Sequence, residues 1–323
     1  MAYLPTLRPR WGRRSAALGA LLWLLLLLPR IGDSPETALM QRIVLLAILV
    51  IVPLGLSLVP APQSKDRDAW MYQLALLAQP FGAIAAIVSF LIEPGVPAAI
   101  LAFLWFCETA IIALLGLWRI GQPEFRSAAE VSINAGLIYL PVGSGWLIVS
   151  RLGIQLFGYG DAIILLTAVH FHFAAYVAPI LAGLAGRKLS KYGRVNQVFK
   201  LATTGIIVGI PLVAVGITFS PQLAFVGTIS ISLGLFLLAI LVAGWIVPSL
   251  GVLPAQILLL ISSASSLPAM AFACLYAYSI VFKKLFLAIP QMAATHGVVN
   301  AFGFALCGLV AWSIMDRSNK HNT

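Results

Sequence analysis

Three of the four histidines in the chain lie inside apolar runs. His170 and His172 fall within residues 166–176, His296 lies in a later run, and His321 belongs to a polar tail. Burying an ionisable ring in hydrocarbon is costly unless it finds a partner, so such residues mark candidate functional sites. Imidazole binds metals and can act as a general acid or base. The three buried histidines therefore predict a metal, haem or acid–base site, and the alternative is that they hydrogen-bond neighbouring helices.

The spacing of the first two histidines limits how they could work together. On a regular α-helix, His170 and His172 point roughly 200° apart, so they cannot readily bind one metal ion. Either the helix is distorted near residues 169–173, or the two rings have different partners. We expect one of them to meet His296 in the outer half of the membrane and the other to meet a separate group such as Glu108.

Two more polar residues join this candidate site. Asn300 follows His296 by four residues and shares its helical face. Glu108 lies near the middle of another apolar run, where a carboxylate is expected to be protonated, paired with histidine or bonded to a hydroxyl. The candidate catalytic residues are His170, His172, His296, Glu108 and Asn300, and the candidate metal ligands are the three histidines.

The run that begins near residue 128 holds three other polar residues. Asn134 and Tyr139 are predicted to line a cavity, although an interhelical hydrogen bond is the alternative for an isolated asparagine. Glu130 is a weaker candidate, because Ser127 and Glu130 have the spacing of a capping box that opens a helix.

Composition shows which elements must hold these residues in place. Hydrophobic residues make up 61% of the chain, charged residues 9%, and the mean hydropathy is +1.02. A soluble domain needs about a quarter of its residues charged, so the chain is predicted to be an all-α, polytopic transmembrane helical bundle. Residues 1–323 are expected to form a single integral membrane domain with about ten spans. The predicted spans are 16–29, 43–59, 70–92, 95–118, 128–150, 161–185, 198–219, 223–247, 253–279 and 289–315.

The basic residues predict the orientation. With both termini in the cytoplasm, fifteen of the twenty lysines and arginines fall on the cytoplasmic side and five fall outside. This bias is typical of topogenic charge, so it explains the net charge of +10 without a nucleic acid partner. We expect membrane lipids as partners and a multi-pass location in a cell membrane, the inner membrane if the source is bacterial.

Three segments also carry a family resemblance. They are AGLIYLPVGSGW at residues 135–146, LTAVHFHF at 166–173 and THGVVNAFGF at 295–304. Over roughly residues 130–312, the chain resembles the YndJ-like bacterial integral membrane proteins. The resemblance implies a multi-pass helical fold and points to His170, His172, His296 and Asn300, but it implies no mechanism.

Three classes of function stay open. The first is an enzyme or redox protein that acts on a lipophilic small molecule, through a metal or haem or through histidine and glutamate acid–base chemistry. The second is a small-solute transporter, although the chain shows no internal repeat of the kind common in transporters. The third is a structural or assembly protein. We favour the first class, and whether a metal, a haem or no cofactor is bound stays open.

Overall fold

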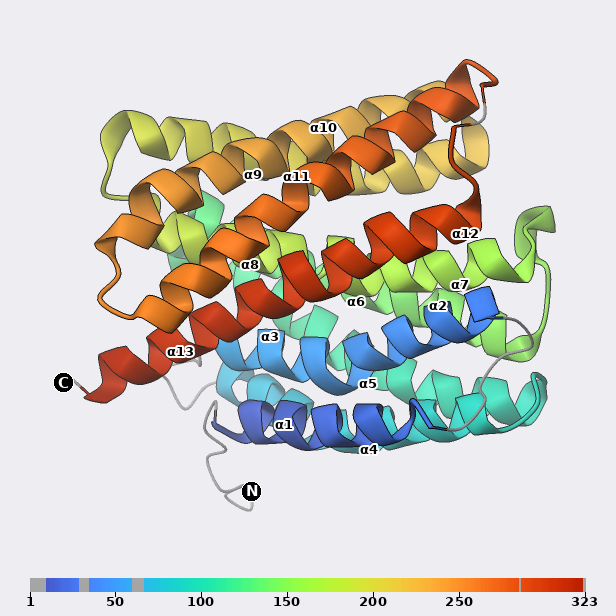
Figure 1. Cartoon of the computed structure of the whole chain (residues 1–323). Helices are drawn as coiled ribbons and strands as arrows, with labels where there is room; N and C mark the ends of the chain where they lie inside the picture. Colours follow the sequence, from blue (N-terminus) through green and yellow to red (C-terminus); the bar gives the residue numbers. More distant parts are fainter. Residues whose placement is uncertain (1–9, 29–34, 60–66, 285, 322–323) are drawn as a thin grey trace. The chain divides into compact units, whose positions relative to one another are not determined.

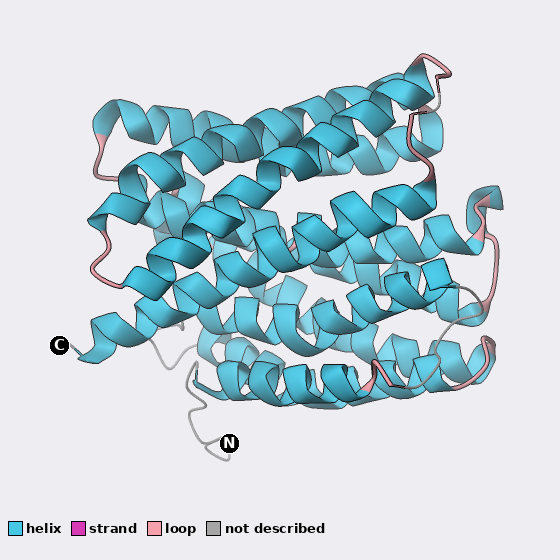
Figure 2. Ribbon diagram, viewed as in Figure 1, coloured by secondary structure: helices cyan, strands magenta, loops and turns pink. Residues whose placement is uncertain are grey.

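A computed structural model of the chain describes residues 10–28, 35–59, 67–284 and 286–321 (Figure 1). Every regular element in this described part is a helix, as Figure 2 shows. This result follows from the composition, because a helix satisfies its backbone hydrogen bonds within one segment and can therefore cross lipid alone. The prediction of an all-α polytopic bundle is confirmed.

Within the described residues, nine helices are long and apolar enough to cross a membrane. Each overlaps one of the predicted spans. The nine are Thr37–Leu58, Ala69–Leu91, Val96–Gly121, Ala128–Leu152, Asp161–Leu189, Gly193–Phe219, Pro221–Ser249, Leu253–Val281 and Ile289–Ser318.

The first predicted span corresponds to α1, Arg10–Leu25, which has 16 residues. At about 1.5 Å per residue it is shorter than a bilayer core. Nevertheless, it packs tightly: a Cβ atom on Gly12 would lie 2.8 Å from the Pro53 carbonyl oxygen, and one on Gly19 would meet the backbone of Leu49. Residue 29, the predicted end of this span, lies outside the described residues.

The chain divides into two compact units, which we call unit 1 and unit 2. Unit 1 comprises residues 1–125 and 136–172, and unit 2 comprises residues 126–135 and 173–323. The expectation of a single integral membrane domain stays a prediction.

Unit 1 contains the helices from α1 to α7. Helices α4 and α5 form a hairpin whose faces meet at Gly82, where an added Cβ would lie 3.2 Å from the side chains of Trp105 and Glu108. The elements are α1, α2 (Pro35–Leu46), η1 (Ala47–Ile51), α3 (Val52–Leu58), α4 (Arg67–Leu91), α5 (Val96–Gly121), η2 (Pro123–Phe125), most of α6 (Ala128–Leu152), η3 (Leu156–Gly158) and α7 (Asp161–His170).

Unit 2 contains the later helices. Helices α9 and α10 pack through glycines, since a Cβ on Gly209 would lie 2.9 Å from the Gly227 carbonyl oxygen. The elements are η4 (Phe171–Ala175), which begins at the end of unit 1, α8 (Val177–Leu189), α9 (Gly193–Phe219), α10 (Pro221–Leu241), η5 (Val242–Ile246), η6 (Val247–Ser249), α11 (Leu253–Val281), α12 (Ile289–Met292), η7 (Ala293–Gly297), η8 (Val299–Leu306) and α13 (Cys307–His321).

Several spans contain π-helical turns, which the assumption of regular α-helices missed. His172 lies in η4, His296 in η7 and Asn300 in η8. In the first case a cause is visible, because the Nδ1 atoms of His170 and His172 lie 2.7 Å and 2.8 Å from carbonyl oxygens four residues earlier. Side chains that bond to these carbonyls compete with the backbone ladder and favour a local change of helical period.

Candidate functional site

The most unusual polar residue in unit 1 is Glu108, on the buried face of α5. Its side chain is 2% exposed, and neither carboxylate oxygen has a hydrogen-bond partner among the described residues. An ionised carboxylate in this setting would lose its hydration without compensation. The position of Glu108 in the interior agrees with the expectation from the sequence, whereas the predicted histidine or hydroxyl partner is not found in the described part of the chain.

Trp105 lies one turn before Glu108 on α5 and contacts His172. The Trp105 indole N–H donates to Nε2 of His172 over 3.0 Å, and the two rings stack with their centroids 6.1 Å apart. The other ring nitrogen, Nδ1, lies 2.8 Å from the Ala168 carbonyl oxygen. A carbonyl can only accept, so Nδ1 carries the proton and Nε2 is the acceptor. His172 is therefore held as one neutral tautomer with both nitrogens engaged.

A hydroxyl pair and a glycine complete this group. Thr109, which follows Glu108, places its hydroxyl oxygen 2.9 Å from that of Ser144 on α6. A Cβ atom on Gly143 would lie 2.7 Å from Nδ1 of His172 and 2.8 Å from Cβ of Phe171, so α6 approaches α7 closely here. We call Trp105, Glu108, Thr109, Ser144 and His172 the polar core of unit 1.

Trp105, Thr109 and Ser144 were not among the residues singled out from the sequence. A signal for one of them was present, because Trp105 lies three residues before Glu108 and therefore close to its helical face. Ser144 follows from no sequence signal that we can identify, since its partner lies on another helix.

His170 and His172 have different surroundings, as their divergence on a helix predicted. His172 is fully buried, whereas His170 is exposed and bonds to the Leu166 carbonyl of its own helix. The alternatives of distortion and separate partners both occur, since η4 begins directly after His170.

His296 belongs to unit 2 and makes its contacts there. Its Nδ1 donates to the Ala269 carbonyl oxygen on α11 over 2.7 Å, and the amide nitrogen of Asn300 lies 3.3 Å from both ring nitrogens. With Nδ1 protonated, Asn300 donates to Nε2. Asn300 and His296, which the sequence places on one helical face, are in contact, while a meeting of His296 with His170 or His172 stays a prediction.

His172 is not free to bind a metal ion as it stands in the structure, and a metal site shared by the three histidines stays a prediction. Both nitrogens of His172 are engaged by protein groups, and a metal at Nε2 would have to displace the Trp105 N–H. Among the described residues, no group of three or more histidine, cysteine, aspartate or glutamate side chains is arranged to hold a metal ion. We therefore derive no chemical step through a metal or a haem.

The remaining predicted polar residues lie on α6. Asn134 is fully buried in the part of the helix assigned to unit 2, and Tyr139 is half-buried in the part assigned to unit 1. The role of both as cavity-lining residues stays a prediction. Ser127 accepts the backbone N–H of Glu130 as a cap, but the Glu130 carboxylate turns instead to the Arg187 guanidinium at 2.5 Å.

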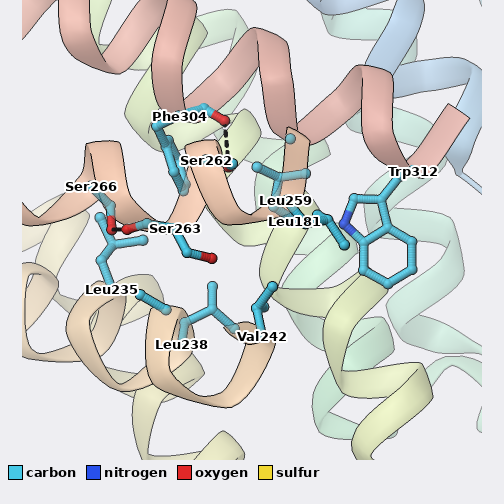
Figure 3. A pocket seen from close by; sticks show the side chains of 12 residues that line it. Leu181, Leu235, Leu238, Val242, Leu259, Ser262, Ser263, Ser266, Phe304 and Trp312 are labelled. Carbon is cyan, nitrogen blue, oxygen red and sulfur yellow. Dashed lines mark hydrogen bonds between the residues drawn. The ribbon is translucent and has the colours of Figure 1, made fainter. Parts of the chain in front are cut away.

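A small cavity lies within unit 2 among α8, α10, α11 and α13 (Figure 3). It encloses about 20 Å³, which is room for a single water molecule. Ser262 donates to the Phe304 carbonyl oxygen over 2.7 Å, and Ser266 bonds back to Ser263 in its own helix. Ser262 therefore links α11 to η8, Ser266 bonds within its own helix, and this cavity is too small for a substrate.

Comparison with known proteins identifies the relatives of the chain. A family model described as YndJ-like protein matches residues 42–304, a range that includes every candidate catalytic residue. The "Uncharacterized membrane protein YndJ" of Bacillus subtilis (strain 168) is 32% identical over 286 residues, which is 88% of this chain and 50% of that protein. The chain therefore spans about half the length of this relative. No solved structure matches.

Proposed function

Since the chain belongs to the YndJ-like family and is a multi-pass protein of the cell membrane, we propose that it is an intramembrane enzyme in which Glu108 exchanges a proton with a lipophilic small molecule. The observation that carries this proposal is the burial of Glu108 with no hydrogen-bond partner among the described residues. Intramembrane carboxyl groups are costly, so one that neither pairs nor reaches water is a candidate for chemistry.

Glu108 is the acid–base group in this proposal. As a carboxylic acid it can give its proton to a bound molecule, and as the resulting carboxylate it can take a proton back. The low-dielectric surroundings make the ionised state short-lived, because the charge has no compensating partner among the described residues. The carboxylate therefore takes a proton back from the same bound molecule, at another atom, so that Glu108 is restored and the molecule is isomerised with no net change in protons.

The rest of the polar core positions the reacting groups. His172 is fixed in one tautomer, so it holds Trp105 in place beside Glu108 rather than exchanging a proton itself. The paired hydroxyls of Thr109 and Ser144 are the groups in the core that can rotate to bond a polar substituent of a substrate. His296 and Asn300 connect η7 and η8 to α11 and have positioning roles in unit 2.

A small-solute transporter is the second candidate, and the π-helical turns favour it. One such turn contains His172, a second contains His296, and a third is Val242–Ile246. Irregular helices often accompany functional sites and movable segments. In this case a proton on Glu108 would drive a change of conformation instead of a reaction.

The test compares Glu108→Gln with the matched control Glu93→Gln, which makes the same chemical change at an exposed position in the turn between α4 and α5. Both variants and the wild type are purified in lipid nanodiscs and incubated with a lipid extract of the host. Chromatography coupled to mass spectrometry then follows new or depleted species, and folded yield is measured separately. We expect the wild type and Glu93→Gln to change the extract and Glu108→Gln to fold but leave it unchanged.

Two other outcomes would reject the enzyme. If liposomes that contain the wild type and Glu93→Gln take up protons while Glu108→Gln does not, and no extract component changes, the protein is a transporter. If Glu108→Gln retains every activity of the wild type, Glu108 is a structural residue. A loss of folded protein in proportion to activity for all core variants would favour the structural or assembly role.

A further inference from the structure

Three aromatic rings meet at one end of unit 1, away from Glu108 along the chain. Trp146 comes from α6, Phe157 from the short turn η3 and Tyr159 from the residues that lead into α7. Their ring centroids are 6.5, 6.3 and 6.3 Å apart, and the ring planes are inclined by 54°, 45° and 70°. Since no pair is parallel, the three rings are tilted against one another and do not form a stack.

The backbone holds one of these rings outward in an unfavourable conformation. Phe157 has φ 56° and ψ 20°, in the left-handed region that bulky residues avoid, and Gly158 follows with φ 75°. The Phe157 side chain is nevertheless 67% exposed, so packing within the protein recovers little of this strain. Strain of this kind persists where a particular conformation serves a function.

Two charged residues lie close in the chain to these rings, and the cationic one, Arg151, is engaged elsewhere. Arg151 directs its guanidinium to the carbonyl oxygens of Ser89 and Ile92 in the turn between α4 and α5, at 3.1 and 2.8 Å. It also lies 5.0 Å above the Phe90 ring. Asp161, which is exposed at the first position of α7, adds negative charge two residues after Tyr159.

We propose that Trp146, Phe157 and Tyr159 form a binding site for an alkylammonium cation such as a trimethylammonium group. A point equidistant from the three centroids lies about 4 Å from each, within the roughly 6 Å over which a ring face attracts a cation. Such a cation is carried by some phospholipid headgroups and by small solutes. The proposal is independent of the chemistry at Glu108.

The first experiment measures binding of choline to the full chain in a detergent without charged groups. The control ligand is 3,3-dimethylbutanol, which has the same shape as choline but no charge. We expect choline to bind saturably and the neutral analogue to bind about tenfold or more weakly, because the cation–π attraction requires the charge. Equal binding of both would overturn the proposal, since the rings would then be an apolar membrane-interface patch.

The second experiment uses Phe157→Gly, which removes one ring and also suits the left-handed backbone. We expect about a tenfold loss of choline binding, as for the loss of one cation–π contact, with thermal stability unchanged or raised. The matched control is Phe282→Ala, which removes an exposed ring from the cluster of Tyr278, Phe282 and Phe286 in unit 2. Wild-type choline binding by Phe157→Gly would refute the site.

The source of the ammonium group is found with nanodiscs of two compositions. If phosphatidylcholine nanodiscs abolish binding of free choline and phosphatidylglycerol nanodiscs do not, a lipid headgroup occupies the site. If choline binds equally in both, the ligand is a soluble ammonium compound. Each result supports the site, whereas binding of choline in neither nanodisc nor detergent would overturn it.

Discussion

Replacing Gly143 by alanine tests the packing that holds the polar core together. The added methyl group would lie 2.7 Å from Nδ1 of His172, 2.8 Å from Cβ of Phe171 and 3.1 Å from the Ala168 carbonyl oxygen. Two of these contacts involve the start of a side chain or the backbone, so rotation of one ring cannot relieve them. Overpacking of this kind costs about 1–3 kcal/mol. If His172 moves, the buried Trp105 N–H also loses its acceptor, at a further cost of about 1–3 kcal/mol.

The matched control lies two residues further along the same helix. A Cβ atom on Gly145 would meet nothing within 4 Å, so Gly145→Ala removes only the conformational freedom of glycine. That change stabilises a helix by up to about 1 kcal/mol. We therefore expect Gly143→Ala to be less stable than the wild type by about 1–5 kcal/mol, and Gly145→Ala to be equally or more stable.

The assay is reversible unfolding in mixed detergent micelles with increasing dodecyl sulfate, followed by circular dichroism. A third variant, Gly143→Ala combined with His172→Ala, removes the ring that the methyl group would meet. The two changes should then cost less together than the sum of their separate costs. Equal unfolding curves for Gly143→Ala and Gly145→Ala would refute the close approach of α6 and α7 at His172.

Three further predictions follow from single contacts and from charge. Trp105→Phe removes the donor to His172, so we expect the free energy of unfolding to fall by about 1–2 kcal/mol in the same assay. The circular dichroism spectrum should be largely unchanged. An unchanged free energy of unfolding would contradict that hydrogen bond. His296→Ala should destabilise unit 2 by a similar amount, because the Ala269 carbonyl loses a donor, and this is measured by protease resistance. Reporter fusions at Lys191 and Lys283 should report opposite sides of the membrane, and the same side for both would overturn the predicted orientation.

The helices could be predicted because the apolar runs that cause them are continuous in the sequence. Apolar runs of 20 or more residues separated by polar breaks leave little choice of structure in lipid. The prediction was least complete at α1, where Arg10, Arg13 and Arg14 lie inside the helix. The buried side of α1 is defined by Gly12 and Gly19, whose contacts with the next span involve residues far away in the sequence.

The candidate site was predictable only in part. Glu108 and His172 were identifiable because a polar residue in an apolar run is conspicuous. The partner of His172 was not identifiable, because the contact between Trp105 and His172 joins residues 67 positions apart. The π-helical turn at Phe171–Ala175 was predicted only as one alternative, a distortion near residues 169–173, since its cause is a local competition for carbonyl groups that apolar periodicity does not record.

The engagement of His172 decides which residue in unit 1 can exchange a proton. Its Nδ1–H is directed to the Ala168 carbonyl and its Nε2 accepts the Trp105 N–H, so an added proton on Nε2 would face another donor. A metal ion would meet the same obstacle. Glu108 lies one turn from Trp105, and neither of its carboxylate oxygens has a hydrogen-bond partner among the described residues. In the proposed enzyme, His172 therefore positions Trp105, and Glu108 is the residue that exchanges the proton.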